Sequence, residues 1–402
     1  MARRNGGFVG QDGLDAPDPP TGVTPTAGNA QVSVAFTAPS DAGTSAITNF
    51  VVQLSTDDTA YSAASNTGTS SPIVVSSLTN GTAATAKVWA INAYGTSSPS
   101  DASASFTPNQ PQRAVVAGGI QNVVVMDYFE ISTLGDAADF GDLVNSAGGM
   151  RNGCGSSTRG IFFGGGDGAS NIETVQYITL ASVGDATDFG DMSTEVREPM
   201  SVSNGTRAVS VGSTSDYNNS MEYVTIASVG NTTDFGDMNG SQIVGGGHGA
   251  ASTTRGIIGG GNNSGVKVHI QYLTIGSTGN TVDFGDATIA RHRQAGFSNN
   301  TRAIWAGGEN DASNLNNVID YVTIASTGNA TDFGDLLSNL TNTTGTSAPT
   351  RGIITSGYNG SGYTNVIQYV TIASTGNAQD FGDLVVSAVH RGATSQAHGG
   401  LA

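Results

Sequence analysis

The feature that most constrains this chain is a four-residue phrase, Asp-Phe-Gly-Asp, that recurs six times after residue 110. The copies stand at 139–142, 188–191, 234–237, 283–286, 332–335 and 380–383, spaced 46 to 49 residues apart. Before each copy come an Arg-led apolar run, a small-residue pair rich in Gly and a Tyr-centred run. A fixed period of this length, built of strands rather than helices, is typical of a propeller or another array of β units. The repeat therefore predicts an all-β architecture for most of the chain.

Composition supports short strands and excludes several classes of protein. Gly contributes 57 residues and charged residues only 12%, with Lys at Lys87 and Lys267 alone, so long amphipathic helices are not expected. A formal net charge of −17 argues against binding nucleic acid through its phosphates. No apolar run is long enough to cross a membrane, so membrane insertion is not expected.

Cysteine usage and the amino terminus bear on where the protein is made. Cys154 is the only cysteine, so no intramolecular disulfide and no Cys-based metal site is expected. Residues 1–13 contain two arginines without a following apolar segment, which is not a conventional secretory signal. Synthesis and folding in a cytoplasm are therefore expected.

Residues 1–107 divide into an arm and a small domain. Residues 1–19 are rich in Gly, Asp and Pro and predict an N-terminal arm that orders against a partner or stays a floppy tail. In 20–107, alternating apolar runs separated by turn signals predict a β-sandwich. The runs are 31–36, 47–54, 72–75 and 86–91, with a closing strand at 103–106. Residues 108–112 read as a linker.

The small domain resembles a fibronectin type III domain. The resemblance rests on Pro20 with Val23 and on the segments 43–47, 78–82 and 92–100, the last reading Asn-Ala-Tyr-Gly-Thr-Ser-Ser-Pro-Ser. Phe36 stands where that family usually has its core Trp, and Ala84 where it has its corner Tyr. The resemblance implies a sandwich of two antiparallel sheets.

Each repeat in 113–402 predicts four short strands, which is one propeller blade. In the copy that begins at Thr158 the strand-like pieces are 158–163, 175–180, 189–192 and 200–203. The order of an Arg-led strand ending in glycines, an aromatic strand and a short outer strand resembles a kelch repeat. The outer Trp typical of kelch is absent, and Asp-Phe-Gly-Asp stands in its place.

The two ends of the array are out of phase by one strand. It opens with a second-type strand at 113–119 and finishes with a first-type strand at 389–395. Pairing these two pieces would remove exposed sheet edges. The fold prediction is therefore an all-β protein: a fibronectin type III-like sandwich followed by a six-bladed kelch-like β-propeller closed by the C-terminal strand.

One Arg and two Asp per repeat predict structural Arg–carboxylate pairs within or between blades. The arginines are Arg113, Arg159, Arg207, Arg255, Arg302 and Arg351, and the aspartates are Asp142, Asp191, Asp237, Asp286, Asp335 and Asp383. The weaker alternative is structural calcium at the Gly-(Asp/Asn)-x-x-Asp turns, whose oxygens suit that ion but are sparser than in a true calcium loop. No cofactor and no metal are otherwise expected.

The loop between the second and third strands varies among copies while the scaffold repeats. Propeller loops of this kind gather on one face, and Tyr, Ser, Gly and Asn form an adaptable contact surface. These loops supply the candidate ligand-binding residues Tyr217, Asn218, Asn262, Asn310, Asp311, Tyr358 and Tyr363. The tyrosines suit stacking on sugar rings; the alternative is a set of ordinary turn residues on a solvated rim.

Nothing in the repeats predicts an enzyme. The five histidines share no short metal-ligand spacing, and no Gly-x-Ser-x-Gly elbow stands between a strand and a helix. The repeats are so regular that they give no sign of convergent carboxylates or histidines at a channel mouth. We therefore predict no catalytic residues.

The wording of the repeats, most closely 321–335, is similar to virion proteins of marine tailed bacteriophages, especially those of cyanobacteria. The resemblance implies a virion structural protein, made in the host bacterial cytoplasm and placed on the particle. Residues 1–20 and the sandwich would contact other virion proteins, and the propeller would bind host-surface glycan or protein as a tail appendage or fibre component. Homo-oligomers on the particle are compatible with this role.

Two other roles stay open at this point. One is a capsid decoration protein without a receptor, and the other is a bacterial carbohydrate-binding or adhesion protein. A secretion signal would favour the adhesion protein. Convergent carboxylates or histidines would favour an enzyme, the third class.

Overall fold

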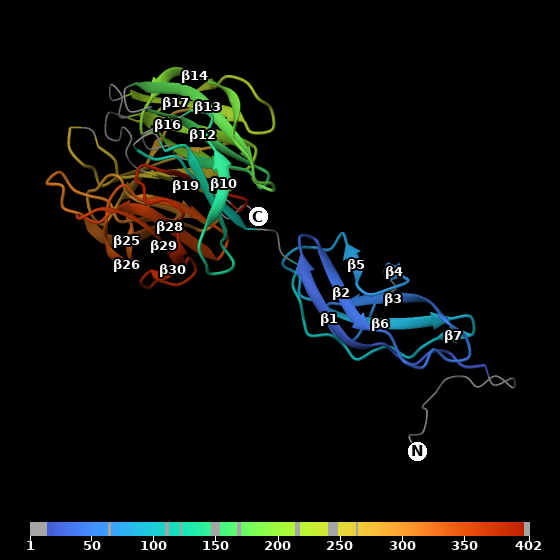
Figure 1. The fold of residues 1–402 in the computed structure, drawn as a ribbon. Helices are drawn as coiled ribbons and strands as arrows, with labels where there is room; N and C mark the ends of the chain where they lie inside the picture. Colours follow the sequence, from blue (N-terminus) through green and yellow to red (C-terminus); the bar gives the residue numbers. More distant parts are fainter. Residues whose placement is uncertain are drawn as a thin grey trace. The chain divides into compact units, whose positions relative to one another are not determined.

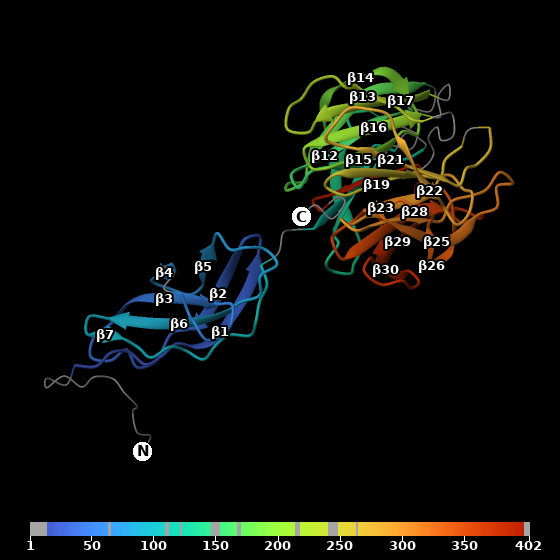
Figure 2. The same ribbon diagram turned by 180° about the vertical axis from the view of Figure 1, so that it is seen from behind.

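The computed structural model describes residues 14–62, 66–108, 112–120, 123–145, 153–166, 170–213, 218–239, 248–262 and 264–397. The chain divides into two compact units, Met1–Pro111 and Gln112–Ala402, and the division falls inside the linker predicted at 108–112. All named elements of the described residues are β-strands, so the all-β prediction is confirmed (Figures 1 and 2). None of the described residues forms a helix with the length and hydropathy needed to span a bilayer.

Unit 1–111 is a sandwich of two antiparallel sheets, ordered β1-β2-β5 and β4-β3-β6-β7 (Figure 1). Val32 and Val34 of one sheet and Phe50 of the other belong to a single buried core, because alternate residues of each strand face inward. Phe36 packs its ring against Phe50 with centroids 4.8 Å apart, so it fills the place predicted for it. The strands are β1 (Thr21–Gly28), β2 (Gln31–Thr37), β3 (Ile47–Ser55), β4 (Asn66–Gly68), β5 (Ile73–Ser76), β6 (Thr85–Asn92) and β7 (Gly95–Thr96).

The closing strand predicted at 103–106 is confirmed only in part: Phe106 forms an antiparallel bridge with Ala84, with two backbone hydrogen bonds of 2.8 and 2.9 Å. Before it, three serines at intervals of three, Ser97, Ser100 and Ser103, follow the edge of β6. Each donates its backbone N–H to a β6 carbonyl at 2.8–2.9 Å, and its hydroxyl accepts a β6 N–H at 2.9–3.0 Å. The serines therefore satisfy both kinds of backbone group along β6 and leave no ordinary strand edge to recruit another chain.

The predicted boundary of the arm at residue 19 lies several residues too late. The backbone N–H of Asp15 donates to the Thr44 hydroxyl at 2.8 Å, and the Asn92 side chain donates to the Asp15 carbonyl at 2.9 Å. Asp18 donates to the carbonyl of Asp41 at 3.0 Å. Residues 15–18 thus belong to the sandwich, because their backbone groups pair with its loops. Residues 1–13 lie outside the described residues.

The described residues of unit 112–402 form six four-stranded antiparallel sheets. Several of their strands are labelled in Figure 2. Their orders are β10-β9-β8-β31, β11-β12-β13-β14, β15-β16-β17-β18, β19-β20-β21-β22, β23-β24-β25-β26 and β27-β28-β29-β30. We call β31, β11, β15, β19, β23 and β27 the inner strands. The bounds of the first three sheets are β8 (Arg113–Ala117), β9 (Val125–Glu130), β10 (Ala138–Asp142), β11 (Gly153–Gly155), β12 (Arg159–Gly166), β13 (Asn171–Thr179), β14 (Thr187–Val196), β15 (Met200–Ser203), β16 (Arg207–Ser213), β17 (Asn218–Thr225) and β18 (Thr233–Asp237).

The other strands complete the array. They are β19 (His248–Ala251), β20 (Arg255–Gly259), β21 (His269–Thr274), β22 (Val282–Asp286), β23 (Ala295–Ser298), β24 (Arg302–Ala306), β25 (Asn316–Thr323), β26 (Thr331–Leu340), β27 (Thr344–Ser347), β28 (Arg351–Tyr358), β29 (Tyr363–Thr371), β30 (Gln379–Asp383) and β31 (Gly392–Ser395). The Arg-led strands are buried on both faces after their first residue, as in β24 with its pattern of one half-buried and four buried residues. They read as continuous apolar runs for this reason.

The first and last strands of this unit pair as predicted. β31 is antiparallel to β8, with Gly392 opposite Ala117 and Ser395 opposite Ala114. The inner strands contact one another in sequence order, and β31 contacts both β27 and β11. One hydrophobic cluster lies between each pair of consecutive sheets, and one of the six joins the β27–β30 sheet to the β8–β10 sheet. The contacts between sheets therefore return to their start.

A backbone junction made by Asp-Phe-Gly-Asp repeats between consecutive sheets. The carbonyl of Phe284 accepts the N–H of Gly328, at 2.8 Å, and the N–H of Asp286 donates to the Asn329 side chain at 3.1 Å. Gly285 lies so close that a Cβ there would be 2.4 Å from the Gly328 oxygen, and its φ is +150°. Only glycine fits such a position. At the seam between last and first sheets, Phe381, Asp383 and Gly382 make the same junction with 135–136.

Candidate functional site

The six repeat arginines form stacks with aromatic rings. Each guanidinium lies over a Tyr ring at 4.1–4.7 Å, and that Tyr meets the repeat's Phe edge-on with ring centroids 5.8–6.2 Å apart. Each arginine also donates to a backbone carbonyl of the next sheet at 2.6–3.1 Å. The donors Arg113, Arg159, Arg207, Arg255, Arg302 and Arg351 reach Leu180, Ile226, Ile275, Ile324, Ile372 and Ile131 in that order.

The predicted Arg–Asp ion pairs are therefore wrong. Within the described residues, no ion pair joins these arginines to Asp142, Asp191, Asp237, Asp286, Asp335 or Asp383; Arg113 contacts Glu130 at 3.4 Å. The aspartates act through their backbone N–H groups in the junctions, and their side chains are exposed or half-buried. The ring stack and the carbonyl satisfy the guanidinium instead.

The turns considered for calcium also take part in the junctions. In each turn the Oδ1 of one Asp or Asn accepts a backbone N–H from the neighbouring sheet at 3.0–3.1 Å. Among the described residues, no group of three or more His, Cys, Asp or Glu side chains is arranged to hold a metal ion.

Tyr358 and Tyr363 lie together on the hairpin between β28 and β29. Their ring centroids are 6.1 Å apart at an interplanar angle of 67°, and Tyr363 is 42% exposed. The Tyr358 hydroxyl donates to the Gly360 carbonyl at 2.9 Å, and Asn359 accepts the N–H groups of Ser361 and Gly362 at 2.9 and 3.0 Å. The hairpin thus presents an ordered aromatic surface, which we call the tyrosine platform.

The other predicted loop residues form hydrogen bonds within their own turns or with neighbouring loops. Asp311 accepts the backbone N–H of Val266 at 2.8 Å, and Asn262 contacts His292 at 3.1 Å. Asn310 accepts the N–H groups of Ala312 and Asn314 at 3.0 Å and so closes its own turn. Tyr217 and the side chain of Asn218 lie outside the described residues.

The sequence analysis missed a group of polar residues where the chain enters the inner strands. Glu198, Arg293, Asn342 and His390 each stand two residues before an inner strand, and their φ angles are 53°–59°. We call these four residues the central cluster. Non-glycine residues seldom adopt this left-handed conformation, and at such positions the strain is commonly associated with function.

Two members of the central cluster touch across sheets that are not neighbours. His390 precedes β31 and Glu198 precedes β15, while β11 lies between these strands and contacts both. His390 Nδ1 nevertheless lies 3.6 Å from Glu198 Oε1, and both side chains are largely buried. The inner strands thus converge at this end. Burial lowers the pKa of His390 to about 4, although Glu198 opposes the change, so the ring is neutral near pH 7.

A second acidic residue adjoins the cluster and connects it with the predicted loops. Glu309, in the loop after β24, accepts from Arg293 at 2.7 Å and lies 3.0 Å from His292 Nε2. The hydrogen bond from His292, together with that from Arg293, lowers the pKa of Glu309 to about 2. His292 in turn contacts Asn262 of the predicted face. Carboxylates and histidines therefore do meet here, contrary to the sequence-based prediction. Glu309 is nevertheless held by Arg293 and His292, and its low pKa does not suit a general acid or base near pH 7.

Several polar atoms around the cluster are buried without a hydrogen-bond partner in the described structure. They are Asn342 Oδ1, His390 Nδ1, Thr344 Oγ1, Gln294 Oε1 and Thr341 Oγ1. Asn342 is 9% exposed and Thr344 is fully buried. Burying such groups unpaired costs free energy, which a ligand offering hydrogen bonds would recover.

A comparison of the four copies that lead into β15, β23, β27 and β31 carries a signal that leads to this cluster. The inner strands β15, β23, β27 and β31 all end in Ser, and each of these serines donates to a backbone carbonyl of the preceding inner strand at 2.6–2.8 Å. The position two residues before the strand reads Glu, Arg, Asn and His instead. A regular strand with an irregular entry residue marks the site, but only once the strand starts are known.

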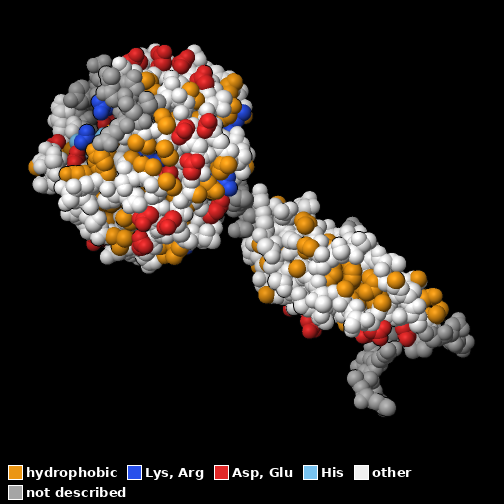
Figure 3. All heavy atoms as spheres, viewed as in Figure 1, with side chains coloured by type: hydrophobic (Ala, Val, Ile, Leu, Met, Phe, Trp, Pro, Cys, Tyr) orange, Lys and Arg blue, Asp and Glu red, His pale blue; other side chains and the backbone are white. Residues whose placement is uncertain are grey.

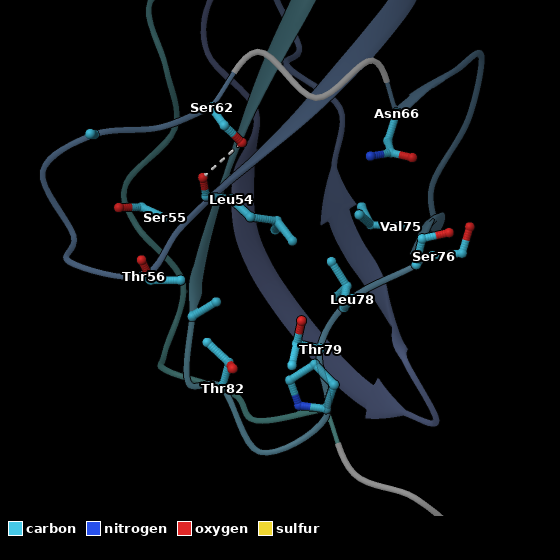
Figure 4. A pocket seen from close by; sticks show the side chains of 14 residues that line it. Leu54, Ser55, Thr56, Ser62, Asn66, Val75, Ser76, Leu78, Thr79 and Thr82 are labelled. Atoms are coloured by element: carbon cyan, nitrogen blue, oxygen red, sulfur yellow. Dashed lines mark hydrogen bonds between the residues drawn. The ribbon is translucent and has the colours of Figure 1, made fainter.

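Unit 1–111 contains a separate hollow of about 510 Å³, lined by Leu54, Val75 and Leu78 among others (Figure 4). Ala84 also lines it and stands where the resemblance places a corner Tyr, so its small side chain leaves space there. None of the described residues that line the hollow is charged. Its apolar and uncharged polar side chains are suited to packing against other groups and not to catalysis.

Comparisons with known proteins identify no family. No protein-family model matches the chain, and no curated protein matches it. A solved structure, the crystal structure of domains A168–A170 from titin, is similar over 24% of this chain and 33% of that chain, at 28% identity and a TM-score of 0.23. The chain thus spans about a third of that structure's length.

Proposed function

We propose that this chain is a non-enzymatic structural protein of a tailed-bacteriophage virion, in which residues 112–402 form a six-bladed kelch-like β-propeller closed by the C-terminal strand. The six four-stranded sheets, the pairing of β31 with β8 and the six hydrophobic clusters support the propeller. The resemblance of the repeats to virion proteins supports a place for the protein on the virus particle. The fibronectin type III-like sandwich would contact other virion proteins.

The tyrosine platform carries the proposal that this protein binds a host-surface glycan or protein. It projects from an ordered hairpin, on the loop face predicted for binding, and Tyr363 is exposed. Aromatic rings bury large apolar area at little entropic cost, and a Tyr hydroxyl adds hydrogen bonding. The net charge of −17 disfavours nucleic acid as the partner, and Asp and Glu side chains lie scattered over the face drawn in Figure 3.

Adsorption to host cells tests the binding role. Tyr363→Ala should weaken adsorption of purified protein or particles several-fold, because it removes the exposed ring of the platform. Tyr94→Ala is the matched control, since Tyr94 is 48% exposed but belongs to the sandwich. Normal adsorption by Tyr363→Ala would favour a capsid decoration protein without a receptor.

Incorporation into particles tests whether the N-terminal arm anchors the protein to the virion. Deletion of residues 2–13 should abolish incorporation and leave both units folded, as judged by an unchanged melting profile. The deletion stops at residue 13 because residues 15–18 bond to the sandwich. Unchanged incorporation would contradict the anchor role of the arm.

A further inference from the structure

We propose that the central cluster is a subsite for one neutral sugar residue of the glycan, recognised by Glu198, Arg293, Asn342 and His390. This inference rests on the proposed function and deepens it. The tyrosine platform would contact further residues of the same glycan. The support comes from four independent features of the cluster.

The first feature is convergence. Side chains from non-adjacent sheets meet at 3.6 Å between His390 and Glu198, and the charge of Arg293 also acts on His390, so the cluster is not confined to one sheet. Four non-glycine residues hold left-handed backbone there. Glycine would adopt this conformation at no steric cost, so side chains at these positions indicate a use for the side chains.

The second feature is unmet hydrogen bonding. The partnerless Asn342 Oδ1 is an acceptor, and the neutral ring of His390 offers Nδ1 as an acceptor in one tautomer. A ligand that satisfies them must donate hydrogen bonds. Thr344 adds a hydroxyl that either donates or accepts. Sugar hydroxyls do both, which suits this mixture.

The third feature is charge balance. Arg293 is paired with Glu309 at 2.7 Å, and Arg197 lies 4.0 Å from Glu198. Two carboxylates thus face two guanidinium groups, and no net charge favours an anion or a cation. An anionic group would also bring only acceptors to a site whose partnerless atoms are largely acceptors. A neutral polyhydroxylated ligand fits best.

The fourth feature is continuity with the tyrosine platform. Thr341, next to Asn342, exchanges two backbone hydrogen bonds with Tyr358, at 2.8 and 3.0 Å. The cluster and the platform are therefore joined directly through one bridge. We infer that a glycan stacked on Tyr363 extends from the platform toward the cluster.

Calorimetric titration of the full chain with monosaccharides tests the subsite. Galactose, mannose and N-acetylglucosamine serve as neutral probes, with galacturonic acid and glucosamine as charged counterparts. At least one neutral sugar should bind saturably and more tightly than the charged ones. Asn342→Gly should weaken this binding about tenfold, the effect of one buried hydrogen bond to a ligand. Tyr363→Ala should leave it unchanged.

The outcomes separate this inference from the proposed function. Saturable binding only of glucosamine or galacturonic acid, or of no sugar at all, would overturn the subsite even if Tyr363→Ala still reduces adsorption to cells. Binding of a neutral sugar that Asn342→Gly and Glu198→Gln do not weaken would also overturn it. Neutral-sugar binding lost in both variants, by a protein that does not adsorb to host cells, would support the subsite and contradict the receptor-binding role.

Discussion

At the junctions between sheets the same residue types make the same contacts, whereas at the described positions of the central cluster no two residues are alike. Each junction has a Gly beside a Gly turn, and each sheet has an Arg over a Tyr over a Phe. The cluster has Glu, Arg, Asn and His at equivalent positions of the backbone. Identical contacts serve stability, which only needs each junction to hold, while different side chains provide the asymmetry that recognition of a ligand requires.

The two regions also differ in how completely their polar groups are paired. Backbone N–H and carbonyl groups at each junction have partners, including those at the seam between the last and first sheets. In the cluster, buried oxygen and nitrogen atoms lack them in the described structure. The comparison predicts that changes at the junctions and the seam destabilise the protein and that removing a partnerless atom from the cluster scarcely does.

The largest effect is expected where the C-terminal strand β31 joins the first sheet. Arg391, buried, donates to Asp127 at 2.7 Å and to the carbonyls of Val116 and Val125 at 3.1 and 3.0 Å. Arg391→Thr should lower the free energy of unfolding by about 3–5 kcal/mol, because it leaves the Asp127 carboxylate buried and unpaired. Urea unfolding measures this loss.

A double variant provides the control for this loss. Gln368 occupies the position of Asp127 in the last sheet, and Thr343 occupies that of Arg391. Asp127→Gln with Arg391→Thr should therefore recover most of the stability. If the single variant is as stable as the parent, the attachment of β31 to the first sheet does not depend on this ion pair.

Acid should weaken the cluster before it weakens the junctions. The pKa of His390 is lowered from 6.5 to about 4, so the folded protein resists a proton that the unfolded chain accepts. Stability should be full above pH 6.5 and fall between pH 6.5 and 4, by about 3 kcal/mol in total. Glu309, with its pKa lowered from 4.5 to about 2, adds a loss only below pH 4.5.

Denaturant unfolding across this pH range gives the measurement. His390→Asn should flatten the curve between pH 6.5 and 4, since Asn342 shows that Asn is accommodated at an equivalent position. An equally steep curve in this variant would assign the pH dependence to other groups.

A single junction between sheets should contribute less to stability than the ion pair between Arg391 and Asp127. Gly285→Ala places a Cβ 2.4 Å from the Gly328 oxygen at a φ of +150°, so unfolding should become easier by about 2 kcal/mol. Gly276→Ala is the control, because nothing lies within 4 Å of its Cβ position. Equal melting temperatures for the two variants would show that the close approach of the glycines does not matter.

The smallest change in stability is expected within the cluster. Asn342→Gly removes a buried, partnerless oxygen and suits the φ of +56°, so the free energy of unfolding should change by less than about 1 kcal/mol in either direction. Thermal unfolding measures this. A large loss would mean that Asn342 supports the fold and would weaken the contrast between junction and cluster.

Periodicity in the sequence was sufficient to predict the four strands of each repeat and the phase shift at the two ends. It did not predict the partners of the repeat arginines, because Tyr rings and carbonyl groups compete with carboxylates and a repeat unit shows all of them together. The number of charged residues per repeat suggested Asp as the partner of each arginine, but in the fold the side chains of Asp142 and its equivalents are exposed or half-buried.

The central cluster was not predictable because its members are far apart in sequence and unlike in type. His390 and Glu198 meet only when the last strand joins the first sheet. Ser97, Ser100 and Ser103 were missed for another reason: a period of three is neither that of a strand nor that of a helix. The loop tyrosines were found because their variation stood out against the repeating scaffold.

The pairing of β8 with β31 has a consequence for synthesis on the ribosome. While translation is in progress, β8 waits without its inner neighbour, and the apolar side of its sheet lies open until nearly the whole unit has emerged. A nascent or prematurely terminated chain would present that open side to chaperones and proteases. The cell would thereby discard incomplete copies before they reach their place of assembly.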